Sequence, residues 1–192
     1  MQKIAEHGKR ADRIVNGMLQ HSRGQAGVRQ PTDINLLLGE DIDLAYHGMR
    51  AQDTSFNVSI DTVLDPSVGS AHVISQDISR IFLNVLNNAL YAAHLKHKEL
   101  GEGFRPTLSV RSTNLGDRLE VRIRDNGNGI PPEIRDQLFQ PFFTTKPTGS
   151  GTGLGLSISR DIVVQEHRGT IEVDSEVGQY SEFIITFPRQ TS

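Results

Sequence analysis

Hydrophobic residues recur along the chain at two spacings, one of which is typical of helices. A spacing of three to four residues predicts long helices over residues 1–23, 32–49 and 75–96. Ser75 is expected to be the N-cap of the third helix. A short helix is expected from Pro131-Pro132 through Leu138, because proline is favoured at the start of a helix. One more helix is expected to follow the glycine-rich segment that ends at residue 153.

The second spacing is the alternation of hydrophobic and polar residues that is typical of strands. It predicts strands near residues 56–60, 108–110, 119–123, 171–173 and 183–187. Most of these strands arrive in adjacent pairs and not as β-α-β units. This order favours an α+β fold, a two-layer sandwich of a mixed β-sheet with helices on one face, preceded by one long helix.

The first helix carries a heptad seam and therefore needs a partner helix. The residues of this seam are Ile4, His7, Ala11, Ile14, Met18 and His21. We divide the chain into this helix at residues 1–23, a Gly- and Pro-containing linker at 24–31, and one domain at 32–192. Because the chain opens directly in a helical pattern, we expect it to be a piece of a longer protein.

Composition and charge narrow the function. The hydrophobic content of 36% is enough for a packed core, and a net charge of −3 offers no basic face for nucleic acid. The absence of cysteine excludes disulfides, thiolate nucleophiles and cysteine-based zinc sites. No apolar run approaches the ~20 residues that span a bilayer. We therefore expect no membrane segment in this chain and a cytoplasmic location, and leave open whether the full-length protein is tethered to a membrane.

Two asparagines lie on the helix expected at residues 75–96. At about 100° per residue, Asn84, Asn88 and Tyr91 form one stripe beside the apolar face. Amides at the edge of a core are costly unless they find partners, and an amide oxygen is a suitable hard ligand for Mg²⁺. Taken alone, the pair is explained equally well as a polar helix flank in contact with solvent.

The segment Asp125-Asn126-Gly127-Asn128-Gly129-Ile130 follows a strand. Asp125 is in phase with the apolar residues of that strand, so its carboxylate is expected on the buried face, where it needs a partner. The exocyclic amine of adenine would be such a partner, and Gly127 and Gly129 would let the backbone approach a flat base. Taken alone, the segment is better explained by a hairpin or an Asx turn.

A loop rich in threonine and glycine precedes the last helix. It begins Pro141-Phe142-Phe143-Thr144-Thr145-Lys146 and continues with glycine at positions 149, 151, 153 and 155. Backbone amides freed by glycine at a helix N-terminus form an anion site, to which Lys146 would add a positive charge. A flexible linker is the alternative, and the four alternating glycines disfavour it. The sequence contains no Walker A triplet, Rossmann fingerprint or protein-kinase signature set.

In this order, the three segments resemble motifs of the GHKL ATPase superfamily, specifically of the catalytic domain of bacterial histidine kinases. The helix with Asn84 and Asn88 resembles the family's N box, and residues 125–129 resemble its first glycine box. Residues 139–143 are similar to its F box and residues 151–156 to its second glycine box. The resemblance covers roughly residues 32–188 and implies a Bergerat-type ATP-binding fold.

The resemblance implies roles for individual residues. Asp125 would bind the adenine amine, Asn88 would hold Mg²⁺, and Asn84 would be a second catalytic residue one turn earlier. The other residues expected to contact ATP are Gly127, Gly129, Ile130, Phe142, Thr145, Lys146, Gly151, Thr152, Gly153, Leu154, Gly155 and Ser181. The Ser181 hydroxyl is expected to join the hydrogen bonds of Asp125. The implied activity is that of an ATP-dependent protein-histidine kinase, which transfers the γ-phosphoryl group of Mg-ATP to a histidine.

The acceptor histidine is expected on a helix that this chain does not contain. His7 and His21 lie in the helix seam, and neither is followed by an acidic residue. Residues 1–23 instead resemble the second helix of a dimerisation and phosphotransfer hairpin. The implied partners are a histidine-bearing helix of the same or a partner chain, the receiver domain of a response regulator, and a second copy in a homodimer.

Departures from the family pattern, of which position 91 is one, and two alternative functions accompany the resemblance. Tyr91 stands where many family members place a phosphate-contacting lysine, and Lys96 and His94 are weak candidates to replace it. Clamp-type ATPases of the superfamily place a water-activating glutamate where Asn84 stands, and an amide cannot accept that proton. A non-catalytic nucleotide-sensing module is the second alternative, which the presence of the metal and loop motifs disfavours.

Overall fold

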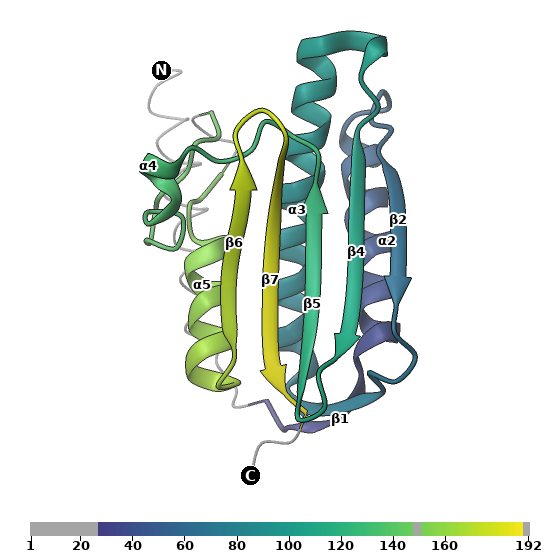
Figure 1. Cartoon of the computed structure of the whole chain (residues 1–192), viewed down its shortest axis with the longest axis vertical. Helices are drawn as coiled ribbons and strands as arrows, with labels where there is room; N and C mark the ends of the chain where they lie inside the picture. The colour runs from purple at the N-terminus through teal and green to yellow at the C-terminus, as the bar shows by residue number, and fades with distance from the viewer. Residues whose placement is uncertain (1–26, 148–150, 190–192) are drawn as a thin grey trace, which may run out of the picture.

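Five strands form one mixed sheet with helices packed on one of its faces (Figure 1). The computed structural model describes residues 27–147 and 151–189, so the helix expected over residues 1–23 lies outside the described residues. The strands follow the order β2 (Ser59–Leu64), β4 (Thr107–Asn114), β5 (Arg118–Asp125), β7 (Tyr180–Pro188) and β6 (Thr170–Glu176). β2 and β4 are parallel and the other neighbours are antiparallel. The expected α+β sandwich is confirmed.

The helical layer consists of α2 (Ile34–Gln52), α3 (Ser75–Leu100) and α5 (Gly155–Asp161), which continues as the π-helical turn η2 (Ile162–Glu166). The short 3₁₀ helix η1 (Gly101–Gly103) follows α3, and the short helix α4 (Pro132–Arg135) lies beside the sheet near β6 (Figure 1). α3 packs against α2, α5, β4 and β5, so it is the central helix of the layer. Its position places the asparagine stripe beside the ends of the central strands.

Strict alternation along the central strands produces the core. In β5, Leu119, Val121 and Ile123 are fully buried against the helices, whereas the residues between them face outward. On the outer face, Arg122 forms ion pairs with Glu120 at 2.6 Å and with Glu182 at 3.2 Å. Asp125 lies two residues after Ile123 and therefore points to the same face, so its side chain is also buried.

A second, two-stranded sheet was not expected from the sequence. β1 (Gln30–Asp33) pairs antiparallel with β3 (Ser70–Val73). The expected linker at residues 24–31 therefore ends too late, because Gln30 and Pro31 belong to β1. β1 buries none of its side chains fully, and β3 alternates but has only four residues, so its period is too short to be read from the sequence.

Several other boundaries also differ from the expectation, including those of α2, which spans Ile34–Gln52 and not residues 32–49. Ser75 is the first residue of α3 and not its cap, because Ile74 occupies the cap position without a side-chain hydrogen bond. α3 continues past residue 96 to Leu100, and α4 ends at Arg135 and not at Leu138. The first expected strand starts at Ser59, since the buried residues near 56–58 belong to the segment before it. Helix ends depend on tertiary contacts, which local periodicity does not report.

Candidate functional site

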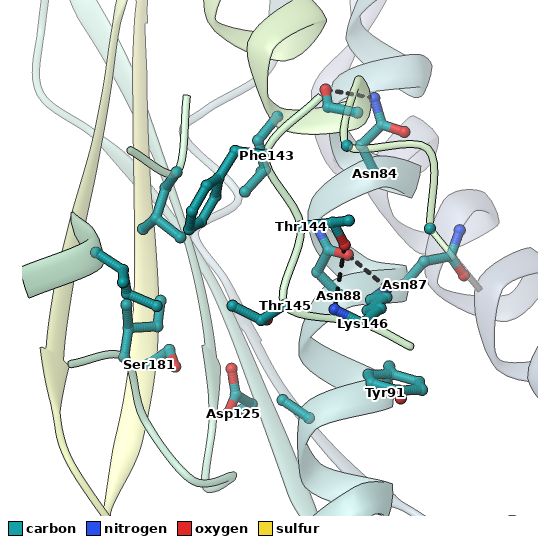
Figure 2. A pocket seen from close by; sticks show the side chains of 18 of the residues that line it. Asn84, Asn87, Asn88, Tyr91, Asp125, Phe143, Thr144, Thr145, Lys146 and Ser181 are labelled. Carbon is teal, nitrogen blue, oxygen red and sulfur yellow. Dashed lines mark hydrogen bonds between the residues drawn. The ribbon is translucent and has the colours of Figure 1, made fainter. Parts of the chain in front are cut away.

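A cavity of about 710 Å³ opens between α3 and the segments that follow β5. The sheet contributes Asp125, Ser181 and Phe183, and α3 contributes Asn84, Asn87, Asn88, Tyr91, Ala92 and Leu95. The remaining walls come from residues 128–138, 143–146 and 151–156. Figure 2 shows Asp125 and Ser181 on one side and the asparagines of α3 on the other, with residues 143–146 crossing between them. The cavity therefore unites all three segments that the sequence singled out.

Asp125 forms the buried polar end of the cavity. Its side chain is 2% exposed, and its backbone lies opposite Ser181 in the β5–β7 pair. The Gly127 N–H donates to Oδ1 of Asp125 at 2.8 Å. Burial raises the pKa of Asp125 to about 7, against the smaller opposing effect of backbone N–H groups, including those of Gly127 and Ser181. Backbone N–H groups thus hold the carboxylate in place, and Asp125 also lines the cavity.

The two glycines after Asp125 are explained by contacts within the protein. Gly127 does not line the cavity, and a Cβ there would lie 2.7 Å from Oδ1 of Asp125 and 2.9 Å from the Ala92 side chain. Gly129 does line the cavity, but its positive φ of 69° and a collision of any Cβ with the Glu176 carbonyl are what require glycine. Contacts within the protein thus already require glycine at both positions, and the expected role of Gly127 towards a base stays a prediction.

A buried serine holds the next residue of this loop. The Ile130 N–H donates to Oγ of Ser175 at 2.8 Å, and the same hydroxyl donates to the Tyr180 carbonyl at 2.7 Å. Ser175 thereby ties the loop after β5 to the β6–β7 hairpin. Sequence reasoning missed it, because a lone serine in an alternating strand carries no distinctive pattern.

At the other end, the two asparagines of α3 have different partners. The Asn84 amide nitrogen donates to the Gly155 carbonyl and to Oγ of Ser159, both at 3.1 Å. The Asn88 oxygen accepts a hydrogen bond of 2.8 Å from Nζ of Lys146. Desolvation lowers the pKa of Lys146, whose ammonium also lies 4.6 Å from the centre of the Tyr91 ring. Asn84 is thus engaged with α5 and Asn88 with the loop, so the two amides do not form a solvated helix flank.

Neither of the substitutes considered for a lysine at position 91 faces this end. Nζ of Lys96 donates to the carbonyls of Asn126, Gly127 and Gly178. Nε2 of His94 lies 3.0 Å from Oδ2 of Asp53, on the side of α3 that packs towards the end of α2. Neither weak candidate lines the cavity, because Lys96 is bound to the loop backbone and His94 to a carboxylate.

The glycine-rich segment contributes most of its expected residues. Thr145, Lys146, Gly151, Thr152, Gly153 and Gly155 line the cavity, whereas Phe142 and Leu154 do not. Phe142 is 52% exposed with a positive φ of 67°, and its neighbour Phe143 lines the cavity instead. Leu154 packs against the hydrophobic core. Backbone conformation decides which phenylalanine points inward, so the sequence alone could not distinguish them.

An apolar wall completes the cavity, and of its residues the sequence predicted only Ile130. It consists of Ala92, Leu95, Pro131, Ile134, Leu138, Phe143, Leu156 and Phe183. Such a wall beside one buried carboxylate suits a flat, mostly apolar base with a polar edge. Ala92 and Phe183 lie in elements whose periodicity marks them as core, whereas Pro131, Leu138 and Phe143 lie in turns or loops without a period, so the sequence indicated no role for them.

The donor set at the asparagine end suits a hard cation that arrives with its own ligands. Among the described residues, no group of three or more His, Cys, Asp or Glu side chains could hold a metal ion. The Asn88 side chain lines the cavity, and its amide oxygen is an uncharged atom that could coordinate a metal ion. Mg²⁺ typically keeps several waters and shares substrate phosphates with few protein ligands, so the residues present fit Mg²⁺ bound together with a polyphosphate.

Residues 74–191 match the family described as histidine kinase-, DNA gyrase B- and HSP90-like ATPases. The chain belongs to this family. Its ATP-binding domain is of the histidine-kinase type, as the named relatives indicate. The sensor protein kinase WalK of Staphylococcus haemolyticus is 33% identical over 198 residues, which cover 95% of this chain and 29% of the relative. The sensory histidine kinase/phosphatase NtrB of Vibrio alginolyticus is 38% identical over 137 residues, which cover 69% of this chain and 37% of the relative.

Solved structures agree on the fold. The catalytic domain of histidine kinase ThkA superposes with a TM-score of 0.67 at 25% identity and covers 85% of this chain and 99% of that one. Full-length ShkA in complex with AMPPNP gives a TM-score of 0.74 at 23% identity, over 100% of this chain and 38% of that one. The chain spans about a third of the length of the curated relatives it matches. Within residues 27–147 and 151–189, no helix is both long and apolar enough to cross a membrane.

Proposed function

We propose that this chain binds Mg-ATP in the cavity and transfers the γ-phosphoryl group to a histidine on a helix outside the chain. The observation that carries the proposal is that the two ends of the cavity have different chemistry. A buried carboxylate, Asp125, lies at one end, and an amide oxygen with an ammonium, Asn88 and Lys146, lies at the other. Adenine and a triphosphate have the complementary chemistry at their two ends.

At the buried end, the ionised Asp125 would accept a hydrogen bond from the exocyclic amine of adenine. The Gly127 N–H fixes one carboxylate oxygen, so the acceptor is held in place before the base arrives. Ile130 and the apolar wall would contact the faces of the ring. Guanine presents a carbonyl where adenine presents the amine, so two acceptors would face each other and GTP would be rejected.

At the open end, Asn88 would be the protein ligand of Mg²⁺, and the phosphates and water would supply the remaining ligands. The metal, when bound, neutralises phosphate charge. Lys146 and the backbone amides near Gly151 and Gly153 would hold the phosphate oxygens. Phosphoryl transfer needs little from a protein beyond positioning and charge neutralisation, so these groups are sufficient if the nucleophile comes from another helix.

The contacts of Asn84 favour transfer over hydrolysis. A hydrolytic member needs a base here to activate water, and an amide cannot accept a proton at neutral pH. The Asn84 nitrogen donates to Gly155 and Ser159, which turns this side chain into a link between α3 and α5. Asn84 would therefore position the glycine-rich segment and not act on water.

The partners follow from the missing nucleophile. We propose that residues 1–23 are the second helix of a dimerisation and phosphotransfer hairpin, followed by a linker and the ATP-binding domain. The acceptor helix would come from the same or a partner chain of a homodimer, and a response-regulator receiver domain would take the phosphoryl group from it. The proposed location of this domain is the cytoplasm.

The test is phosphoryl transfer to a supplied histidine-bearing hairpin. The chain is incubated with γ-labelled ATP and Mg²⁺, with and without the hairpin, and with a hairpin in which the histidine is replaced by glutamine. Label that is labile to acid, stable to alkali and present only on the histidine-bearing hairpin supports the proposal. Release of inorganic phosphate without a labelled hairpin would indicate an ATPase, and nucleotide binding without either product would indicate a sensing module.

A further inference from the structure

Lys146 contacts two residues of α3 across the cavity. Its ammonium donates to the Asn88 oxygen at 2.8 Å and lies 4.6 Å from the centre of the Tyr91 ring. Asn88 and Tyr91 are three residues apart and therefore adjacent on the helix surface. Figure 2 shows Lys146, in the segment that crosses the cavity, next to Asn88 and close to Tyr91.

These contacts leave the positive charge of Lys146 without a counterion. Within residues 27–147 and 151–189, the ion pairs involve the carboxylates of Asp53, Glu120 and Glu182, and none includes Lys146. A neutral amide and an aromatic ring hold an ammonium more weakly than a carboxylate does. An arriving phosphate would therefore be a better partner than either of the two present ones.

The Asn88 oxygen is also the atom proposed to bind Mg²⁺. A Mg²⁺ ion lies about 2.1 Å from an oxygen ligand. If both lone pairs of one oxygen were used, the ion and the ammonium would be only about 4 Å apart. Like charges at that distance in a partly buried cavity repel each other. The two cations therefore compete for Asn88.

We propose that Lys146 is the resident cation of the nucleotide site: it occupies the Asn88 oxygen in the free protein and passes to the phosphates when Mg²⁺ takes that oxygen. Tyr91 is the platform that holds the ammonium beside both positions. The inference rests on the proposed function, because it assigns Asn88 to Mg²⁺ and this end of the cavity to the phosphates.

The proposal accounts for the departure at position 91. A lysine on α3 would place a second ammonium beside Lys146, whereas the face of the Tyr91 ring attracts it. The positive charge at this point thus comes from the segment opposite α3. Lys96 cannot supply it, because its ammonium is bound to three backbone carbonyls of the adjoining loops.

The first arm of the test observes Lys146 directly by NMR in the full chain labelled with ¹³C-lysine. Protons next to an ammonium that lies over an aromatic face are shifted upfield, and the Lys146 signal is assigned by its loss in Lys146→Arg. We expect this upfield shift in the free wild type and in Tyr91→Phe, and its loss in Tyr91→Leu. A non-hydrolysable ATP analogue should move the signal further when Mg²⁺ is present than when EDTA is present.

The second arm measures the gain in affinity that Mg²⁺ gives the same analogue, as the ratio of dissociation constants in EDTA and in Mg²⁺. In Lys146→Met the metal is the cation that neutralises the phosphates and meets no ammonium at Asn88, so we expect this gain to be about threefold to tenfold larger than in the wild type. When Asn88→Ala is also present, the gain in affinity from Mg²⁺ should be small, and it should be the same with lysine or methionine at position 146. Circular dichroism confirms that each variant is folded.

The outcomes separate the two proposals. An unshifted Lys146 signal in the free wild type, or an equal Mg²⁺ gain in the wild type and Lys146→Met, overturns the exchange while leaving ATP binding intact. Absence of analogue binding to the wild type in Mg²⁺ overturns the proposed function, and the exchange with it. A shift that depends on the Tyr91 ring, together with a larger gain in Lys146→Met, supports the exchange.

Discussion

Asp125→Asn should stabilise the free protein and weaken ATP binding. Burial raises the pKa of Asp125 from 3.8 to about 7. Each pKa unit is worth about 1.4 kcal/mol, so this difference corresponds to about 4 kcal/mol. Because the folded-state pKa lies above the unfolded value, stability from this group is fully present below about pH 4 and is lost as the pH rises to about 7. At neutral and alkaline pH the ionised Asp125 therefore opposes folding.

Asparagine has nearly the same shape and does not ionise. We expect Asp125→Asn to raise the free energy of unfolding by about 1–3 kcal/mol at about pH 8, which is below the full value because the amide meets the Gly127 N–H less favourably. For a domain of this size, that corresponds to a rise of roughly 3–10 °C in the melting temperature. ATP binding should weaken by roughly tenfold to a hundredfold, since a hydrogen bond to a charged group is worth about 1.5–3 kcal/mol.

The assay combines thermal unfolding of the free chain with calorimetric titration of ATP between about pH 6 and about pH 9. Protons compete with adenine for Asp125, so the wild-type affinity should fall below about pH 7 more steeply than that of Asp125→Asn. The titration of the phosphates is common to both proteins and cancels in this comparison. A variant less stable than the wild type at about pH 8, or one that binds ATP equally well, would refute the reasoning.

Three other substitutions test individual contacts. Asn88→Ala should remove most of the affinity gained from Mg²⁺ without unfolding the protein, and calorimetry that finds equal losses in Mg²⁺ and in EDTA would exclude Asn88 as a metal ligand. Ser175→Ala leaves the Ile130 N–H and the Tyr180 carbonyl unpaired, so denaturant titration should show a loss of about 1–3 kcal/mol. Gly153→Ala, at φ +67° against the Phe142 backbone, should melt earlier and bind ATP more weakly, whereas Gly103→Ala, with open space around it, should match the wild type in both measurements.

Periodicity predicted the buried end of the site well. The alternation along β5 places Leu119, Val121 and Ile123 in the core, and continuing it by two residues puts Asp125 in the same layer. The helical period likewise aligned Asn84, Asn88 and Tyr91, and all three line the cavity. Both results depend on regular backbone, because in a helix or a strand the direction of a side chain follows from its position in the sequence.

The sequence could not predict features that depend on irregular backbone or on distant partners. β1 and β3 pair across about 40 intervening positions; β1 has no buried face, and the alternation in β3 is only four residues long. The glycines after Asp125 could be recognised as necessary, but not that Ala92 and Glu176 are the neighbours that require them. The contact of Lys146 with Asn88 joins a loop to a helix, and no local period encodes such a pair.

The two asparagines of α3 show how identical side chains one turn apart acquire different functions. Asn88 offers its oxygen to a cation, so its partner can change with the state of the site. Asn84 offers its nitrogen to the Gly155 carbonyl at the start of α5, so its role is to hold that helix start against α3. A carboxylate in place of Asn84 has no N–H to donate, so both hydrogen bonds would be lost, and its oxygens would face the partial negative charge of the Gly155 carbonyl oxygen. Replacement of Asn84 by glutamate would therefore disturb the glycine-rich segment before it supplied a base, and the arrangement around Asn84 is itself an argument against a hydrolytic site.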